Sequence, residues 1–240
     1  MVLRKWEDLP DTMKNDSVRK YYDILKKRQK SLITKRVFDF IAAIILLVIL
    51  SPILLILSIA IKLDSTGPVM FRQIRVTQYG RQFRIFKFRT MVNNADKIGT
   101  QVTVNNDTRV TKVGKILRRL RLDEIPQLFN IISGDMSFVG TRPEVVKYIE
   151  QYSDGMMATL LLPAGVTSEA SIQFKYEERL LANAENADEA YVTTVLPEKM
   201  KYNLRSIKEF SFLGEIMTMF RTFWAVVQKD DESDDGVRSL

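Results

Sequence analysis

The segment VFDFIAAIILLVILSPILLILSIAI, residues Val37 to Ile61, is the longest apolar stretch of this chain and decides how the rest can fold. It contains one charged residue, Asp39, near its start. An apolar run of more than about 18 residues is typical of a membrane helix. Ser51 and Pro52 interrupt the run in its middle, and an interior proline breaks or kinks a helix. The sequence therefore predicts a membrane helix that is broken or kinked at this pair.

Positive charge lies on both sides of the apolar run. At about 1.5 Å per residue, neither the part before Pro52 nor the part after it crosses a hydrocarbon core of about 30 Å alone. Positive flanks stay on the cytoplasmic side, so a re-entrant hairpin that enters and leaves by one face satisfies both observations. A single-pass helix and a buried core helix are the alternatives. The flanking cations are Lys26, Lys27, Arg28, Lys30, Lys35 and Arg36 before the run, and Lys62, Arg72, Arg75, Arg81, Arg84, Lys87 and Arg89 after it.

The composition of the 240 residues limits the chemistry that the chain can perform. The net charge of +7 suits anionic lipid, a phosphorylated ligand or nucleic acid, and the apolar run favours the first two over nucleic acid. The chain has no cysteine, which excludes disulfides and thiol chemistry. It also has no histidine, which excludes Ser–His and Cys–His catalysis and histidine-based zinc sites. An enzyme of this composition has to use carboxylates, Lys, Arg, Tyr, Ser or Thr.

The charge and hydropathy pattern divides the chain into four parts. Residues 1–34 form a basic amphipathic segment, which predicts either a helix in the lipid headgroup layer or an ordinary helix packed on the body. The membrane helix occupies 35–62, and the domain that carries the candidate site occupies 63–228. The last part, 229–240, is acidic and is predicted to be disordered.

Two short strands and several helices are predicted after the apolar run. Val69–Phe71 and Phe83–Phe88 read as strands joined by a turn at Tyr79-Gly80, with Phe83, Ile85 and Lys87 on one face. Lys112–Leu122 has the spacing of an amphipathic helix with many cations. The polar stretch 92–111 reads as a loop and 163–167 as a turn, 172–208 reads as helices, and the apolar stretch 212–227 either packs as a final core helix or lies on the membrane.

The pair Asp123-Glu124 is the strongest candidate for chemistry. It directly follows the cationic helix, and Pro126 suits the first turn of a new helix, which would place Asp123 at or near its N-cap. A helix N-terminus and nearby guanidinium groups favour negative charge, so we expect Asp123 to be ionised and able to act as a nucleophile or a metal ligand. A plain capping role is the alternative. Arg142, held extended before Pro143, suits a phosphate.

The order of these motifs resembles that of the bacterial sugar transferases, the monotopic phosphoglycosyl transferases of glycoconjugate assembly. The resemblance covers about residues 35 to 225. The motifs that carry it are Lys35-Arg36-Val37-Phe38-Asp39, Ser51-Pro52, Gly67-Pro68-Val69-Met70-Phe71-Arg72-Gln73-Ile74-Arg75, Phe86-Lys87-Phe88-Arg89-Thr90-Met91, Leu122-Asp123-Glu124-Ile125-Pro126-Gln127-Leu128, Gly134-Asp135-Met136-Ser137-Phe138-Val139-Gly140 and Arg142-Pro143.

The resemblance implies an α/β fold: a membrane-associated monotopic domain with a Pro-broken re-entrant helix, a small β-hairpin or sheet and several amphipathic surface helices. It also implies transfer of a sugar-1-phosphate from a nucleoside diphosphate sugar, usually a UDP-sugar, to polyprenyl (undecaprenyl) phosphate. In that reaction Asp123 would be the nucleophile that forms a covalent phosphosugar–aspartate, Glu124 together with Asp123 would hold Mg²⁺, and Arg142 would contact the nucleotide phosphates. This is the first membrane step of polysaccharide assembly, and a carboxylate nucleophile divides the transfer into two steps.

The resemblance also places the protein at the bacterial inner membrane, with the active site on the cytoplasmic face, and it leaves homodimerisation open. Further cations near these motifs are candidate substrate-binding residues, namely Lys87, Arg89, Arg75, Arg118 and Arg119.

Three positions depart from the family pattern. Thr141 stands where the family usually has proline, Ala164 where it commonly has glycine, and Asn203 where many members have aspartate. These departures concern the turn before Arg142, a second turn and a third acidic group near the metal. Two other functions stay open: a non-catalytic, membrane-anchored basic scaffold, and a single-pass transferase in which the lipid phosphate attacks directly. A scaffold has no need of the acidic pair at Asp123.

Overall fold

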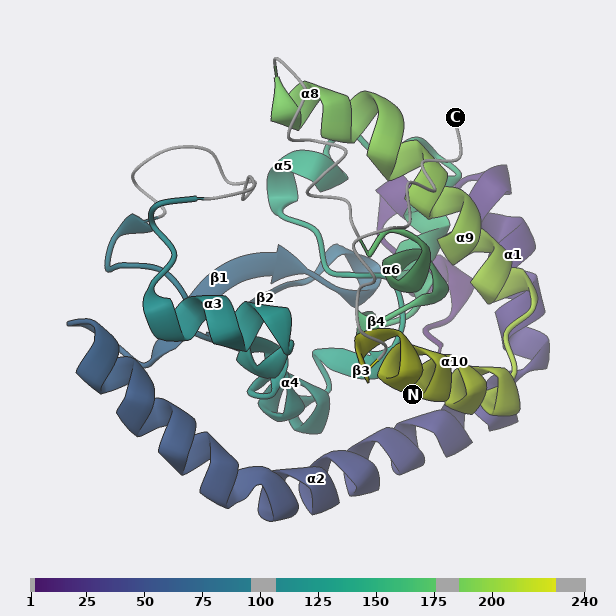
Figure 1. Ribbon diagram of the computed structural model, residues 1–240. Helices are drawn as coiled ribbons and strands as arrows, with labels where there is room; N and C mark the ends of the chain where they lie inside the picture. The colour runs from purple at the N-terminus through teal and green to yellow at the C-terminus, as the bar shows by residue number, and fades with distance from the viewer. Residues whose placement is uncertain (1–2, 96–106, 176–185, 228–240) are drawn as a thin grey trace.

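The computed structural model describes residues 3–95, 107–175 and 186–227, and shows a mixed helical and β-sheet body that lies on one long apolar helix (Figure 1). The predicted acidic tail 229–240 and the middle of the predicted loop 92–111 lie outside these residues. The helices are α1 (Asp16–Lys27), α2 (Gln29–Asp64), α3 (Lys112–Arg119), α4 (Gln127–Ser133), α5 (Val146–Ile149), α6 (Glu169–Gln173), α8 (Ala187–Ala190), α9 (Leu196–Lys208) and α10 (Phe212–Val227). The strands are β1 (Met70–Val76), β2 (Gln82–Phe88), β3 (Met136–Val139) and β4 (Ala164–Thr167), and the short helical turns are η1 (Trp6–Asp8), η2 (Asp11–Met13), η3 (Gln78–Gly80), η5 (Leu122–Glu124), η6 (Met156–Leu161) and η7 (Tyr191–Val195).

Helix α2 is continuous for 36 residues and contains Pro52. Of the two outcomes predicted for this proline, a break does not occur, and the helix axis bends instead as it passes beneath the body (Figure 1). By length and composition α2 is the one helix of the described part of the chain that could cross a membrane. At about 1.5 Å per residue the continuous helix is about 54 Å long, which exceeds a hydrocarbon core of about 30 Å.

Ser51 compensates for the hydrogen bond that Pro52 cannot make. Because proline has no N–H, the carbonyl of Val48, four residues earlier, loses its helical donor. The Ser51 hydroxyl donates to that carbonyl over 2.8 Å. An unpaired backbone carbonyl is costly in lipid, so this pair allows a bend without an unsatisfied group in the apolar part of the helix.

One face of α2 packs on the body along most of its length. Its buried residues in the first half, Leu32, Lys35, Asp39 and Ala43, recur at the three- and four-residue spacing of one helix face. Near the other end, Ile61 is buried with Phe88 and Leu117 in a second apolar cluster. Both ends of the helix therefore contact the same body.

The β-structure consists of two separate pairs of strands. Strands β1 and β2 form the predicted antiparallel hairpin, with Met70 opposite Phe88 and a turn in which Tyr79 has φ 59°. Strands β3 and β4 form a parallel pair, which the sequence did not predict because both segments are short and rich in turn residues. This second pair places the stretch that leads to Arg142 beside β4.

The N-terminal segment packs on the body rather than on lipid. In α1, Val18, Tyr22 and Leu25 are buried in the largest core cluster, together with Leu161 of η6 and Phe210. The apolar face of this helix packs on the body, as one of the two interpretations predicted, and contact of its exposed basic face with lipid headgroups stays a prediction.

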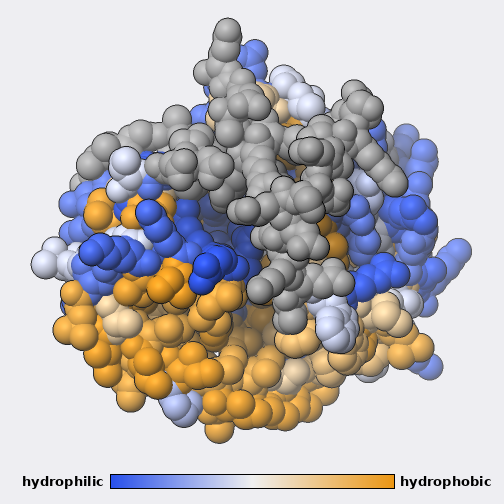
Figure 2. Space-filling model, in the orientation of Figure 1, coloured by the Kyte–Doolittle hydropathy of each residue, from blue (hydrophilic) through white to orange (hydrophobic). Residues whose placement is uncertain are grey.

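A broad apolar surface covers the lower side of the molecule, as Figure 2 shows. The outward side chains of α2 and of α10 supply most of it, and α10 thus presents an exposed apolar face beside the long helix. An exposed patch of this kind marks an interaction site, which is compatible with membrane association. Its large residues include Val37, Ile41, Ile45, Val48, Ile49, Leu55, Ile56 and Ile59 on α2, and Leu213, Met217, Phe220, Phe223 and Trp224 on α10.

Candidate active site

The acidic pair lies in a short helical turn, η5, between two helices. Helix α3 ends at Arg119, and Arg121 adopts the left-handed conformation with φ 55°, which turns the chain into η5. The residue that caps α4 is Pro126, so Asp123 is not the N-cap itself and lies three residues before it, in η5. The helix expected after Pro126 is confirmed as α4. Asp123 therefore does not receive the first-turn N–H groups of α4 that were expected to keep it ionised.

Glu124 is held by two cations from distant parts of the chain. Lys87 of β2 donates to its Oε1 over 2.7 Å, and Arg142 donates to the same oxygen over 3.1 Å. Burial raises the pKa of Glu124, but Lys87 and Arg142 outweigh it and hold the pKa well below its usual range. Burial conversely lowers the pKa of Lys87, and the carboxylate of Glu124 opposes that shift. The structure thus brings three predicted site residues together as one ionised cluster.

Asp123 differs from its neighbour because little charge compensates its burial. Its side chain is 8% exposed, and its Oδ1 has no hydrogen-bond partner among the described residues. Burial raises the pKa of Asp123, although Lys87 and Arg118 act in the opposite direction. A buried carboxylate oxygen without a partner suits a cation or a reacting electrophile, since natural proteins rarely leave such an atom unpaired without a functional reason.

The backbone before Arg142 is held by the two parallel strands. Gly165 of β4 donates to the carbonyl of Thr141 over 2.9 Å, and Gly140 and Gly165 lie so close that a Cβ on Gly165 would stand 2.1 Å from the Gly140 nitrogen. The departure at Thr141 thus lies in a backbone segment that strand pairing holds in place. The turn predicted at 163–167 is wrong, because Ala164–Thr167 is strand β4. In this strand the close approach needs glycine at 165, where this chain has it, and not at Ala164. Arg75 donates to the carbonyl of Pro143, the residue after Arg142, over 3.2 Å and so helps to fix the backbone at Arg142.

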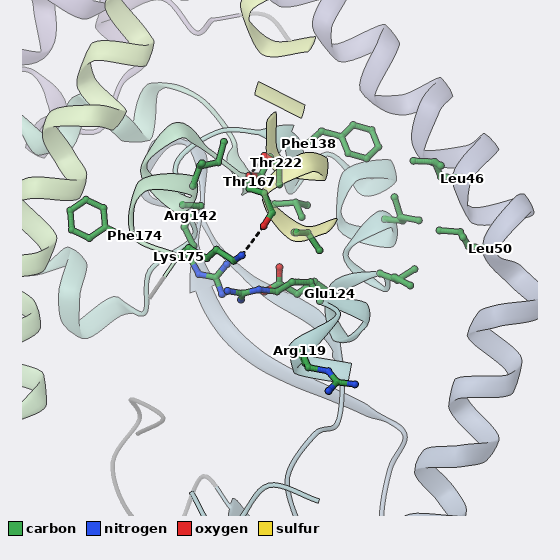
Figure 3. A pocket seen from close by; sticks show the side chains of 18 of the residues that line it. Leu46, Leu50, Arg119, Glu124, Phe138, Arg142, Thr167, Phe174, Lys175 and Thr222 are labelled. Atoms are coloured by element: carbon green, nitrogen blue, oxygen red, sulfur yellow. Dashed lines mark hydrogen bonds and ion pairs between the residues drawn. The ribbon is translucent and has the colours of Figure 1, made fainter. Parts of the chain in front are cut away.

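A cavity of about 390 Å³ extends from the apolar helix α2 to Glu124 (Figure 3). One end is lined by apolar side chains and the other by cations around Glu124, while Asp123 lies next to this lining and is not part of it. The apolar lining includes Leu46, Leu50, Leu128, Phe138, Val166 and Val226, and the cations are Arg119, Arg121, Arg142, Lys175 and Lys199.

Three other predicted substrate-binding residues lie in different surroundings. Arg119 lines the cavity as expected. Arg118 donates to the hydroxyl of Thr90 over 2.9 Å, and its charge acts to lower the pKa of Asp123. Arg89 is buried and donates to the carbonyls of Ser65 and Thr66, so it holds the turn that follows α2 and is not part of the cavity lining. A direct role for Arg89 in substrate binding stays a prediction.

Sequence reasoning missed three cations of the cavity: Arg121, Lys175 and Lys199. Lys199 is 4% exposed and donates to the hydroxyl of Tyr191 over 3.2 Å. Lys175 donates to the carbonyl of Ala225 in α10 over 2.8 Å and so closes one side of the cavity. Both lie in segments whose charge alternates, where a local pattern gives no sign of a site. Asn203 is buried one helical turn after Lys199 and does not line the cavity.

The residues present fit a magnesium ion held jointly with a substrate. Among the described residues no group of three or more His, Cys, Asp or Glu side chains comes together. Mg²⁺ requires fewer protein ligands, because it commonly binds one or two carboxylates together with substrate phosphates and water. The unpaired Oδ1 of Asp123, with Glu124 beside it, provides that set. Position 203 is asparagine and adds no carboxylate to this set.

Comparison with known proteins establishes the class. The family model described as bacterial sugar transferase matches residues 30–229, and the chain belongs to this family. It is 36% identical over 196 residues to the UDP-N-acetylgalactosamine-undecaprenyl-phosphate N-acetylgalactosaminephosphotransferase of Aeromonas hydrophila, which covers 80% of this chain and 43% of that protein.

Two further relatives act on other sugars. The UDP-glucose:undecaprenyl-phosphate glucose-1-phosphate transferase of Escherichia coli (strain K12) is 38% identical over 193 residues, which cover 78% of this chain and 39% of that protein. The undecaprenyl-phosphate galactose phosphotransferase of Salmonella typhimurium is 30% identical over 218 residues, which cover 85% of this chain and 42% of that protein. The chain thus spans about two fifths of the length of these relatives.

Proposed function

We propose that this protein transfers a sugar-1-phosphate from a nucleoside diphosphate sugar, most simply a UDP-sugar, to polyprenyl phosphate. The names of the relatives described above state such transfers, with N-acetylgalactosamine, glucose or galactose as the sugar. The observation that carries the proposal is the cavity that connects Leu46 and Leu50 of the apolar helix with the ionised cluster at Glu124. A lipid phosphate and a sugar nucleotide need such a cavity in order to meet.

The proposed reaction has two displacements at one phosphorus atom. An oxygen of Asp123 attacks the phosphate nearest the sugar, and the bond to the nucleoside monophosphate breaks, so that group leaves with the electron pair. An oxygen of polyprenyl phosphate then attacks the same phosphorus, and the bond to Asp123 breaks and restores the carboxylate. The step requires that the carboxylate of Asp123 reaches the substrate beside Glu124.

The cationic end of the cavity suits the charge of this reaction. Phosphoryl transfer depends mainly on in-line positioning and on neutralisation of charge over the phosphate oxygens. Arg142 and Lys199 can face the diphosphate. Lys87 donates to Oε1 of Glu124 over 2.7 Å and so keeps this carboxylate ionised. When bound, Mg²⁺ at Asp123 and Glu124 would neutralise part of the negative charge on the diphosphate and on the leaving nucleoside monophosphate.

We infer that α2 is a re-entrant helix. Both of its ends contact the same body, through Asp39 at one end and Ile61 at the other, and its outer face is apolar. This arrangement supports an anchor that enters and leaves by one membrane face, with the active site on the cytoplasmic face of the bacterial inner membrane. Epitope tags placed before Lys35 and after Lys229 should then both resist external protease in intact cells, whereas exposure of one tag would support the single-pass alternative.

The function is tested with the purified full chain in nanodiscs. UDP-glucose, UDP-galactose and UDP-N-acetylgalactosamine are each incubated with Mg²⁺ and undecaprenyl phosphate, and release of UMP is measured. Release with at least one of them, dependent on undecaprenyl phosphate for continued turnover, is the expected result. No release with any of these donors would contradict the proposal and support a non-catalytic scaffold.

A further inference from the structure

The start of α2 carries charged residues that are buried against the catalytic body rather than placed toward lipid. Lys35 is 3% exposed and Asp39 is 1% exposed. Lys35 forms an ion pair with Glu215 of α10 and lies 3.7 Å from Asp39. Isolated charges are expensive to bury, and their pairing shows that this part of α2 is built to contact protein.

Arg36 connects the start of α2 with the helix that follows the acidic pair. Its guanidinium donates to the carbonyls of Ile131 and Ile132, over 2.6 and 3.1 Å. These carbonyls belong to the last turn of α4, where a helix lacks internal donors and a cation is favourable. Because α4 has only seven residues and begins three residues after Glu124, a cation that fixes its end also limits the motion of its beginning.

Asp39 connects the same part of α2 with the strand that leads to Arg142. Ser137 of β3 is fully buried, and its hydroxyl donates to Asp39 over 2.7 Å. Strand β3 ends at Val139, and the chain then passes directly to Arg142, whose guanidinium binds Glu124. Residues 35–39 of α2 therefore hold both segments that meet at Glu124.

We propose that Arg36 and Asp39 are positioning residues, which fix α4 and β3 against the membrane helix and thereby set the geometry of the acidic pair. This proposal rests on the proposed function for its kinetic readout. In this proposal Arg36 does more than orient α2 by the positive-inside rule. For orientation alone, any cation near the membrane would be sufficient. Lys30 and Lys62 are exposed cations on the same helix and provide matched controls.

The test compares Arg36→Gln with Lys30→Gln and Lys62→Gln in the purified full chain in nanodiscs. UMP release without acceptor is measured with whichever of the three UDP-sugars the native protein uses. A small displacement of reacting groups can cost about 100-fold in rate. We therefore expect Arg36→Gln to lower the single-turnover rate constant about 10- to 100-fold, with the donor concentration that gives half the maximal rate unchanged within about twofold. Arg36→Lys should restore part of the rate, and both control variants should match the native protein.

A parallel comparison addresses Asp39. Asparagine keeps an oxygen that accepts from Ser137, whereas leucine does not. Asp39→Asn should therefore retain much more activity than Asp39→Leu, and Ser137→Ala should resemble the leucine variant in its rate. Equal losses in Asp39→Asn and Asp39→Leu would contradict a role through the Ser137 hydrogen bond.

Hydrogen–deuterium exchange gives a readout that does not depend on the reaction. In Arg36→Gln, exchange should increase in peptides covering 122–133 and remain native in β1 and β2. If the native protein releases no UMP, the proposed function fails, but this exchange result still decides the positioning claim. Native exchange in 122–133, or an equal increase throughout the protein, would overturn it.

Discussion

The two ends of the cavity have opposite chemistry. The end at Glu124 is surrounded by Arg119, Arg121, Arg142, Lys175 and Lys199, whereas the end at α2 consists of Leu46, Leu50 and other apolar side chains. A charged donor from the cytosol suits the first end, and the chain of a lipid acceptor suits the second. One cavity of this kind can accommodate two substrates from different phases, so changes at its two ends should affect different steps.

The largest effect is expected from Asp123→Asn. The amide cannot act as the nucleophile, so we expect UMP release to fall at least about 10³-fold while the protein stays in the membrane fraction. Release of UMP is assayed on purified protein, and membrane retention is checked by fractionation. Near-native turnover of the variant would show that the carboxylate does not attack.

A somewhat smaller effect is expected from Arg142→Lys. Lysine keeps the charge but loses the planar fork that contacts Glu124 and can hold phosphate oxygens. We expect kcat/KM for the UDP-sugar to fall about 10- to 100-fold. Arg81→Lys, at a cation that is about half exposed and pairs with Asp135, is the control and should have native kinetics. If both variants behaved alike, Arg142 would have no specific role.

The apolar end is tested by Leu50→Trp. A larger side chain should obstruct the acceptor chain, so we expect the KM for undecaprenyl phosphate to rise about tenfold, while UMP release without acceptor stays native. Leu55→Trp changes an exposed leucine of the same helix outside the cavity lining and should leave both values native. A slower UMP release in Leu50→Trp would mean that the two ends of the cavity do not act separately.

The smallest effect is expected from Pro52→Ala, which changes the topology of α2 at a position outside the cavity lining. Alanine restores an N–H that can pair with the Val48 carbonyl, so α2 should straighten toward a spanning helix. We expect part of the population to expose a reporter placed after α2 outside the cell. A reporter found only on the cytoplasmic side would contradict this role of the proline.

Local patterns in the sequence predicted much of this arrangement. The hairpin β1–β2 and the helix at α4 follow from strand alternation and turn residues. Lys87, Glu124 and Arg142 were each site candidates, but their ion pairs with one another were not predicted. The alternation of side chains along β2 also predicted that Lys87 lies on the same face as Phe83 and Ile85, which are buried.

The remaining features depend on contacts between distant segments. Asp123 is not an N-cap because Arg121 adopts a left-handed conformation that no residue pattern indicated. Lys175, which follows α6, and Lys199 of α9 both line the cavity because α6 packs against α9 and α10. Pro52 did not break α2, because Ser51 replaces the missing donor and the body supports the helix on one face.

The most direct test of the account is to trap the phosphosugar on the protein. The purified chain is mixed with the active UDP-sugar and Mg²⁺ without undecaprenyl phosphate, quenched, digested and analysed by mass spectrometry. We expect a peptide that contains Asp123 and is heavier by one sugar phosphate. This peptide should be absent in Asp123→Asn and should disappear when undecaprenyl phosphate is added before the quench. Lipid-linked product formed at the native rate, with no adduct on Asp123 under rapid quench, would contradict the covalent mechanism and support direct attack by the lipid phosphate.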